Sequence, residues 1–197
     1  MGGQWKRTPL PVVDLPGLRP TPARVRETLF NWLGQDLTGW RCVDAFAGTG
    51  ALGLEAASRG AAEVVLMEHS AVLVDSLRQT LRKLQARQVR LERGDALPSL
   101  RRMAGQNWDV VFLDPPFLQG DNEAVFQHAL QAAAQAVSPT GWVYLESPRA
   151  WSDAELAASG LVAARRGKAG AVHHSLLQRT PAGAPESTAE LDTPAGE

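Results

Sequence analysis

The sequence contains little that could cross-link the chain or hold a metal ion. Its 197 residues include one cysteine, Cys42, and four histidines, and no histidine pair has the H-E-x-x-H spacing of a zinc site. A single cysteine cannot form an internal disulfide or a cysteine-cluster metal site, and it is typical of a protein from a reducing compartment. We therefore predict no disulfide, no metal and a cytoplasmic location.

The chain also lacks a long apolar run. No stretch approaches the roughly 18 apolar residues that a membrane helix needs, and the first ten residues, MGGQWKRTPL, contain no apolar core of a signal peptide. With 44% hydrophobic residues, the chain can still bury one core of the size usual for a single domain. These features predict a soluble protein with one folded domain and no membrane partner.

Positive charge is scarce at the C-terminal end. Residues 180–197 contain four acidic residues and no Lys or Arg, so residues 1–179 carry 20 basic and 17 acidic side chains and are mildly basic. The tail, TPAGAPESTAELDTPAGE, has no aromatic residue and is rich in Pro, Gly, Ala, Ser and Thr. Such a composition cannot bury enough apolar surface to offset its ordering entropy, so we predict a disordered acidic tail, with docking to a partner as the alternative.

Short apolar segments alternate with helical ones between about residues 38 and 179. RCVDAF, AAEVVLME, QVRLER, WDVVFLD and GWVYLE are typical of strands, whereas Val74, Leu77, Leu81 and Leu84 recur at helical spacing. This alternation predicts an α/β fold with a mostly parallel sheet and helices on both faces. GLVAARRGKAGAVHHSLLQR leaves no room for a crossover helix, so it predicts two antiparallel strands at the C-terminal end.

The N-terminal region predicts an arm followed by an amphipathic helix. Residues 1–20 contain four prolines and are expected to form an arm rather than a core element. Thr21 as N-cap and Pro22 at the first helical position start a helix that runs to about Gly34. We thus expect an arm over 1–20, a domain over 21–179 and a tail over 180–197. The helix would bury four apolar residues, Val25, Leu29, Trp32 and Leu33.

A glycine-rich segment follows the first predicted strand. VDAFAGTGALGLEAASRG places Gly48, Gly50 and Gly53 in G-x-G-x-x-G spacing where a strand turns into a helix, which lets backbone approach a ligand closely. Glu68 ends the next strand, about 20 residues further on, where a carboxylate can hold the hydroxyls of a ribose. Asp95 follows the third strand. These carboxylates predict a nucleotide-like ligand, although each could instead cap the end of its strand.

The charges favour one nucleotide-like ligand over others. A P-loop would need Lys and Ser or Thr after the last glycine, but Gly53 is followed by Leu and Glu, which excludes a nucleoside triphosphate. Asp44, Glu68, Asp95 and Asp114 would rim the site with no basic residue nearby. S-adenosylmethionine is cationic and carries no phosphate, so this rim favours it over an NAD-type dinucleotide, which stays open because NAD sites also use an acidic residue.

The segment FLDPPF explains why a buried strand would end on a carboxylate. Methylating an aromatic amine requires acceptors that hold its N–H groups, and Asp114 with a carbonyl of Pro115 or Pro116 could provide them. Phe117 would offer a flat face on which a base can stack. The alternative is a proline-rich turn that only ends a strand.

These motifs resemble those of a known family. FLDPPF resembles the Asp/Asn-Pro-Pro-aromatic motif of class I methyltransferases that modify amino nitrogens, and DAFAGTGALGLEAASRG resembles their motif I. GLRPTPARVRETLFNWL is similar to the signature of the RsmD family, bacterial enzymes that methylate the N2 amine of a guanine in 16S ribosomal RNA. The similarity covers roughly residues 2–179. It implies a Rossmann-like, seven-stranded sheet, S-adenosylmethionine as donor and a 30S assembly particle as substrate.

The resemblance also assigns residues. Asp114, Pro115, Pro116 and Phe117 would hold the guanine. The residues expected to bind the cofactor are Asp44, Phe46, Ala47, Gly48, Thr49, Gly50, Gly53, Glu68, His69, Gly94, Asp95 and Ala96. The residues expected to contact RNA are Arg19, Thr21, Arg24, Arg26, Glu27 and Asn31. For the charged residues of this last group an ordinary solvated face is the alternative, and for His69 a capping role beside Ser70.

The sequence departs from the family at its beginning. Family members usually have an extra strand before GGQW, whereas here Met1 directly precedes Gly2, which leaves the RNA contacts of the arm open. Other functions also stay open: methylation of DNA adenine or of a protein glutamine, NAD-dependent oxidoreduction, and a catalytically silent RNA-binding assembly factor. We expect a monomer.

Overall fold

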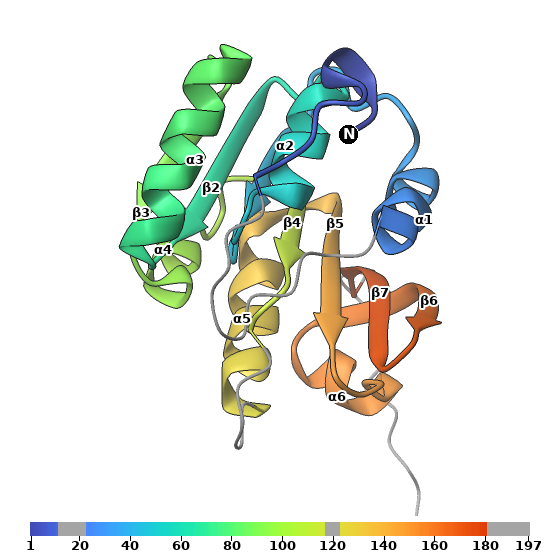
Figure 1. Cartoon of the computed structure of the whole chain (residues 1–197). Helices are drawn as coiled ribbons and strands as arrows, with labels where there is room; N and C mark the ends of the chain where they lie inside the picture. The colour runs from blue at the N-terminus through green and yellow to red at the C-terminus, as the bar shows by residue number, and fades with distance from the viewer. Residues whose placement is uncertain (12–22, 117–122, 181–197) are drawn as a thin grey trace, which may run out of the picture.

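A computed structural model of the chain describes residues 1–11, 23–116 and 123–180 (Figure 1). The predicted disordered tail, apart from Thr180, lies outside the described residues, as do the predicted helix start at Thr21 and Pro22 and the proposed stacking residue Phe117. Within the described part of the chain, no helix is long and apolar enough to cross a membrane.

Seven strands form one sheet, in the order β3-β2-β1-β4-β5-β7-β6. The first five strands pair in parallel, whereas β7 pairs antiparallel with both β5 and β6. The predicted mostly parallel sheet with an antiparallel C-terminal pair is therefore confirmed. The strand bounds are β1 Arg41–Asp44, β2 Glu63–Glu68, β3 Val89–Arg93, β4 Trp108–Leu113, β5 Val137–Ser147, β6 Leu161–Ala169 and β7 Val172–Arg179.

Helices cover both faces of the sheet, as the alternation of strand and helix patterns predicted. One buried cluster joins α1, α2 and α3 to the sheet, and a second joins α4, α5 and α6 to its other face. Each cluster takes alternate residues of the same strands, because successive side chains of a strand point to opposite faces. The helix bounds are α1 Ala23–Leu33, α2 Ala51–Ser58, α3 Ala71–Leu84, α4 Ala96–Arg102, α5 Glu123–Ala136 and α6 Asp153–Ala158.

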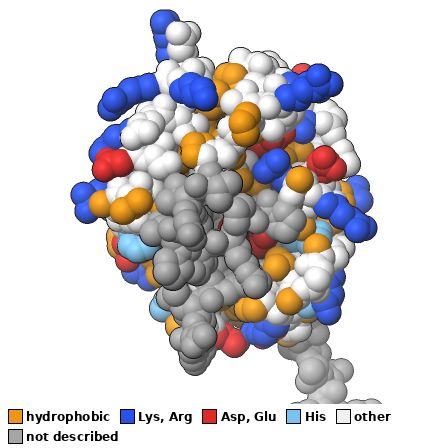
Figure 2. Space-filling model, viewed as in Figure 1, with side chains coloured by type: hydrophobic (Ala, Val, Ile, Leu, Met, Phe, Trp, Pro, Cys, Tyr) orange, Lys and Arg blue, Asp and Glu red, His pale blue; other side chains and the backbone are white. Residues whose placement is uncertain are grey.

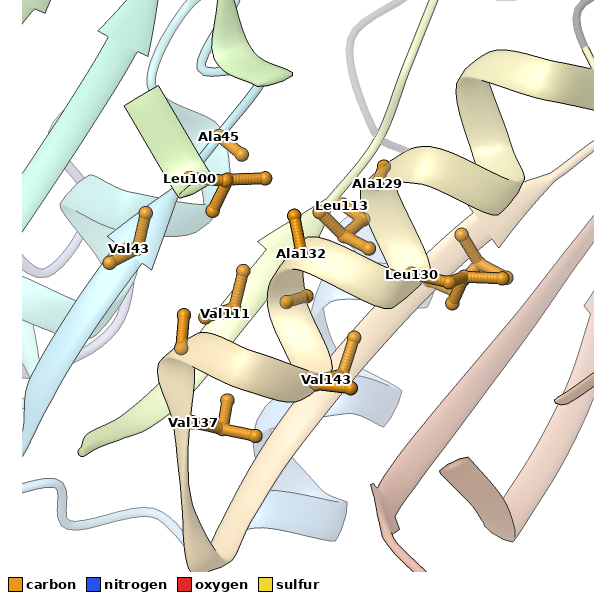
Figure 3. Close-up of a cluster of buried hydrophobic side chains, with 14 of the residues drawn as sticks. Val43, Ala45, Leu100, Val111, Leu113, Ala129, Leu130, Ala132, Val137 and Val143 are labelled. Atoms are coloured by element: carbon orange, nitrogen blue, oxygen red, sulfur yellow. The ribbon is translucent and has the colours of Figure 1, made fainter. Parts of the chain in front are cut away.

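The packing against α5 illustrates how small residues let a helix lie close to the sheet. Figure 3 shows Ala129 and Ala132 of α5 beside Leu113 and Val111 of β4, with Val143 of β5 next to them. Alanine at the contact keeps the helix backbone near the strands, and the larger strand side chains fill the space between the layers. The result is a fixed position for the carboxyl ends of β4 and β5.

Helix α1 has the faces that its sequence predicts, and it ends at Leu33, just before Gly34 with φ +99°. Val25, Leu29 and Leu33 are buried, Trp32 is partly buried, and Phe30 is also buried, which the predicted pattern did not include. The Phe30 ring lies 6.2 Å from that of Phe112 on β4. Helix α1 therefore packs on the strand that leads into Asp114.

The N-terminal segment is docked on the domain rather than extended from it. The 3-10 turn η1 (Gly3–Trp5) lies beside α2 (Figure 1). The Gly2 amide donates to Glu55 Oε1 at 2.8 Å, and the Trp5 amide donates to Ser58 Oγ at 2.8 Å. The expected arm over 1–20 thus begins with a turn that is hydrogen-bonded to the second helix.

Candidate active site

The candidate site lies at β1, where the chain stops adding strands on one side of the sheet and continues on the other side. The strand that follows β1 in the chain is its neighbour β2 on one side, whereas β4 lies on its other side. In open α/β sheets, ligands bind beyond the carboxyl ends of the strands at such a switch point. The loop after β1 and the Asp114 segment after β4 both leave the sheet there, so the topology brings the two predicted motifs together.

The glycine loop is a tight turn whose backbone conformation requires glycine. Gly48 has φ +55° and Gly50 has φ +82°, and the Gly50 amide donates to the Ala47 carbonyl at 2.6 Å. A Cβ atom at Gly50 would lie 2.8 Å from Leu77 Cδ2, so this position is also closed to a larger residue by packing. The predicted strand-turn-helix geometry of the loop is present.

Gly53 and Asp44 lock the start of α2 against β1. The Gly53 amide donates to Asp44 Oδ2 at 2.9 Å, and a Cβ atom at position 53 would lie only 2.3 Å from Leu66 Cδ2. The third glycine of the motif therefore allows close packing of helix on strand. Asp44 is 1% exposed and holds the loop from beneath.

Glu68 ties the glycine loop to the next helix. Its Oε2 accepts from the Gly48 amide at 2.9 Å, and its Oε1 accepts from the Ser70 amide at 2.8 Å. The alternative expected His69 to cap the helix with Ser70, and in the structure the side chain that caps α3 is that of Ser70. The His69 side chain itself is 83% exposed, with Nδ1 3.3 Å from Glu68 Oε1. A carboxylate has about four acceptor sites, so Glu68 can still accept from ribose hydroxyls.

Asp95 combines its expected position with the alternative capping role. It lies two residues after the end of β3 and is exposed, and its Oδ1 accepts from the Leu97 amide at 3.1 Å as N-cap of α4. The Gly94 amide donates to the Glu68 carbonyl at 3.0 Å, which holds this segment beside Glu68. Ala96 is buried under the start of α4. The structure therefore places the Gly94–Ala96 segment next to the glycine loop.

The remaining predicted cofactor residues lie in the loop between β1 and α2. Ala47 is buried and its amide donates to the Met67 carbonyl at 2.9 Å, whereas Phe46 and Thr49 are partly exposed. After β4, Asp114 is partly buried, Pro115 is buried and Pro116 is exposed. The described members of both predicted motifs thus sit at one edge of the sheet.

Burial and like charges dominate the electrostatics of this edge. Burial raises the pKa of Asp44 to about 7; the Gly53 hydrogen bond lowers this pKa, and the charges of Asp114 and Glu68 raise it. Among the described residues, Asp44 forms no ion pair with Lys or Arg. A cationic ligand at this edge would relieve the repulsion between the carboxyl groups.

A further carboxyl group, which the sequence reasoning did not include, lies beside Asp114. Glu146 is the second-last residue of β5 and is 3% exposed, and Tyr144 Oη donates to its Oε1 at 3.0 Å. Burial raises the pKa of Glu146 to about 8, with Asp114 as the next cause. The rule that selected Asp44 and Glu68, a carboxylate at the carboxyl end of a strand, would also have selected Glu146 from GWVYLE.

The predicted RNA-contacting residues of α1 divide into two groups. Arg24, Glu27 and Asn31 are exposed, as the helical spacing predicted. Arg26 instead lies with its Nε 3.5 Å from Oε2 of the buried Glu55 on α2. Arg19 and Thr21 lie outside the described residues. On the face shown in Figure 2, the Lys and Arg side chains of the described residues are scattered among apolar and acidic ones and do not gather in a single basic patch.

Comparison with known proteins covers nearly the whole chain. The model of the family described as "Conserved hypothetical protein 95" matches residues 1–178. The curated "Ribosomal RNA small subunit methyltransferase D" of Escherichia coli strain K12 is 41% identical over 153 residues, which span 75% of this chain and 73% of that protein. The protein of the same name from Haemophilus influenzae is 37% identical over 152 residues, spanning 76% and 78%.

Solved structures agree with the sequence comparison. The structure of the Escherichia coli protein yhhF superposes with a TM-score of 0.72 at 33% identity, and the match covers 90% of this chain and 95% of that chain.

Proposed function

This chain belongs to the RsmD family, the family of the model described as "Conserved hypothetical protein 95", and from that premise we propose that it is a ribosomal RNA methyltransferase that uses S-adenosylmethionine. The finer part of the proposal is that it methylates the exocyclic N2 amine of a guanine of the 966 type in 16S ribosomal RNA. The observation that carries the proposal is the juxtaposition, at the switch point between β1 and β4, of the glycine loop and Asp114.

The residues at this edge fit the proposed cofactor. S-adenosylmethionine would supply a methyl group on a positively charged sulfur. The turn at Gly48 and Gly50 exposes backbone for close approach, and Glu68 is anchored where it can accept from a ribose. The buried Asp44 lies below a site that favours positive charge, which is the sign of the sulfonium and ammonium groups and opposite to that of a dinucleotide pyrophosphate.

Asp114 and the proline pair would manage the acceptor amine. When bound, the cofactor would supply the methyl group to the guanine N2 nitrogen, with the electron pair of the broken carbon–sulfur bond left on sulfur. The nitrogen loses one proton, which the Asp114 carboxylate accepts and then passes to solvent. Before transfer, Asp114 and a main-chain carbonyl of the Pro115–Pro116 pair hold the two N–H groups, so that the nitrogen lone pair points at the methyl group.

The RNA would approach over the exposed face of α1. This helix packs on Phe112, two residues before Asp114, and it presents Arg24, Glu27 and Asn31 to solvent. Contacts to phosphates and flanking bases from this face would place the target guanine over Asp114. We propose that the substrate is a 30S assembly particle and that the protein acts as a cytoplasmic monomer.

Labelled S-adenosylmethionine tests the proposal directly. The purified chain is incubated with undermethylated 30S particles and, separately, with naked 16S ribosomal RNA, and the label is mapped by nuclease digestion and mass spectrometry. Label on guanine N2 is the expected result, and greater transfer to the particle supports the particle as substrate. Label on a protein glutamine of the particle, or cofactor binding without any transfer, would each overturn it in favour of a different function.

A further inference from the structure

Glu146 is a buried acid at the proposed reaction centre that the proposed mechanism does not yet use. The register of β4 with β5 pairs Phe112 with Tyr144 and Leu113 with Leu145. Continued by one residue past Leu113, the last residue of β4, the same register would place Asp114 opposite Glu146, and side chains two residues apart on a strand share a face. The Phe112 and Tyr144 rings meet edge to face at 6.4 Å, which shows that side chains of this face are in contact.

The surroundings of Glu146 disfavour a second negative charge. It is 3% exposed, and the titratable groups that face it from the described elements are Asp114 after β4, Asp44 on β1, Tyr144 on β5 and His174 on β7. None of these supplies a permanent positive charge, and burial lowers the pKa of His174, which keeps that imidazole neutral. An ionised Glu146 would be buried beside other carboxylates, which costs free energy through lost hydration and through repulsion. A proton on Glu146 removes both contributions.

One carboxyl oxygen of Glu146 already accepts a hydrogen bond. Tyr144 Oη donates to Oε1, and the Tyr144 ring is fully buried, so this hydrogen bond fixes the rotation of the carboxyl group. A proton carried on the other oxygen, Oε2, is then available for donation toward the neighbouring acid. Two carboxyl groups that share one proton are a known way to keep one of them ionised and oriented.

On the basis of the proposed function, we propose that Glu146 is a positioning residue for methyl transfer: its carboxylic acid, held by Tyr144, donates a hydrogen bond to Asp114 and orients that carboxylate toward the guanine amine. Glu146 keeps its own proton throughout. The proton that leaves the amine goes to the second oxygen of Asp114 and from there to solvent, so the step balances without any further reactant.

The pH dependence of methyl transfer separates this role from a purely structural one. The pKa of Glu146 is raised to about 8, so in the wild-type chain kcat should fall as pH rises through that value, because an ionised Glu146 repels Asp114 and has no proton to donate. In Glu146→Gln the amide N–H₂ donates at every pH. We expect this variant to keep its rate at pH 7 within about threefold and to lose the alkaline decline.

Two further variants sharpen the test. The Tyr144 hydrogen bond lowers the pKa of Glu146, so Tyr144→Phe should raise that pKa and move the alkaline decline to higher pH. Glu63→Gln is the matched control, because Glu63 lies at the opposite, amino end of β2 and its side chain is 38% exposed. Its pH profile should coincide with that of the wild type.

A measurement without RNA makes the outcome independent of turnover. Carbon-13 NMR of the Glu side-chain carboxyls, assigned by Glu146→Gln, should show Glu146 protonated at pH 6. Coincident pH profiles of wild type and Glu146→Gln, a uniform loss of rate at every pH, or an ionised Glu146 at pH 6 would each overturn the proposal.

If Glu146→Gln does not fold, the direction in which Tyr144→Phe shifts the alkaline decline decides the question. If the wild type methylates no RNA, the proposed function fails and this role with it, even where Glu146 titrates as expected.

Discussion

An alanine at position 53 would place its Cβ atom 2.3 Å from Leu66 Cδ2 and 3.1 Å from Asp44 Cβ. Because Asp44 is buried and hydrogen-bonded to the Gly53 amide, neither neighbour can move freely. We expect Gly53→Ala to lower the free energy of unfolding by about 1–3 kcal/mol, measured by urea denaturation, and to weaken S-adenosylmethionine binding, measured by calorimetry. Gly94→Ala is the stability control, since a Cβ there meets nothing within 4 Å. Equal stability of the two variants would contradict the packing argument.

Asp114 is the residue on which the proposed chemistry depends most directly. Asp114→Ala removes the acceptor for the amine and for its proton, so we expect kcat for RNA methylation to fall about 100-fold or more, with cofactor affinity within about twofold of the wild type. Asp75→Ala, an exposed acid on α3 that pairs with Arg78, should leave both unchanged. A variant that lost cofactor binding and turnover together would show that Asp114 acts on the donor instead.

For single residues, the sequence predicted where the acidic side chains lie better than it predicted their hydrogen-bond partners. The expectation that Asp44, Glu68 and Asp95 lie at strand ends is confirmed, but each also accepts a backbone amide, as the capping alternative predicted. A side chain can anchor a loop and still face a ligand, and spacing alone does not distinguish these uses. Glu146 also ends a predicted strand, GWVYLE, but its burial could not be read from that strand alone, because Glu146 pairs with His174 on β7, which comes much later in the chain.

The N-terminal turn is an element whose docking depends on one glycine. Gly3 has φ +60°, and a Cβ atom there would lie 1.8 Å from the Ser58 carbonyl oxygen of α2. We expect Gly3→Ala to detach the turn, so that the Trp5 amide loses its hydrogen bond to Ser58 and exchanges with solvent as in an unstructured peptide, measured by hydrogen-exchange mass spectrometry.

Gly170 offers a matched control for that element. Its φ of +61° equals that of Gly3 within a degree, but a Cβ there meets nothing within 4 Å. Gly170→Ala therefore carries the same backbone strain without the clash, and Trp5 should stay protected. Loss of protection in both variants would mean that strain in the glycine backbone, rather than contact with α2, controls the turn.

Elements with a strong local pattern were predicted well, and those that depend on pairing were not. The pattern of α1 and the G-x-G-x-x-G loop are local, and both were confirmed. Strand β5 was expected to begin at Gly141, but it begins at Val137, directly after α5. Val137 pairs with Trp108 before the register shifts to pair Trp142 with Val110. Ser138, Pro139 and Thr140 resemble a turn in the sequence, and they lie at this register shift, so only the pairing of Val137 and Trp142 on either side of them makes them part of a strand.

For the whole molecule, the buried acids predict an unusual dependence of stability on pH. Asp44 and Glu146 have their pKa raised, to about 7 and about 8, so the folded state binds more protons than the unfolded state up to those values. Their contribution is complete below the unfolded pKa and is lost as pH rises through the folded pKa. His174, with its pKa lowered from 6.5, acts in the opposite direction, and its effect fades above pH 6.5, where the unfolded state loses this proton as well.

Between pH 6.5 and 8, the change in the free energy of unfolding should therefore come mainly from Asp44 and Glu146. We expect the free energy of unfolding, from urea titrations at fixed ionic strength, to fall by on the order of 1–2 kcal/mol across this interval. Glu146→Gln should flatten the decrease, because the amide does not ionise. Stability that stays constant over this interval would show that both acids are already ionised in the folded protein.

The overall architecture was predictable because each strand–helix repeat carries its own signal, and parallel pairing follows from the crossover helices. No single strand–helix repeat predicts which strands become neighbours in the sheet. Both the position of β4 beside β1 and that of β7 between β5 and β6 depend on contacts between distant segments, such as the pairing of Asp44 with Phe112 and of Leu177 with Ala163.

The contact between α1 and β7 has a consequence for synthesis. Trp32 stacks on His174 at 5.3 Å, so a helix near the beginning of the chain packs on the last strand. As the chain emerges from the ribosome, the helix has no partner at this position until translation has passed residue 179. The packing of α1 on the sheet is thus completed only when β7, the last strand of the domain, has been made.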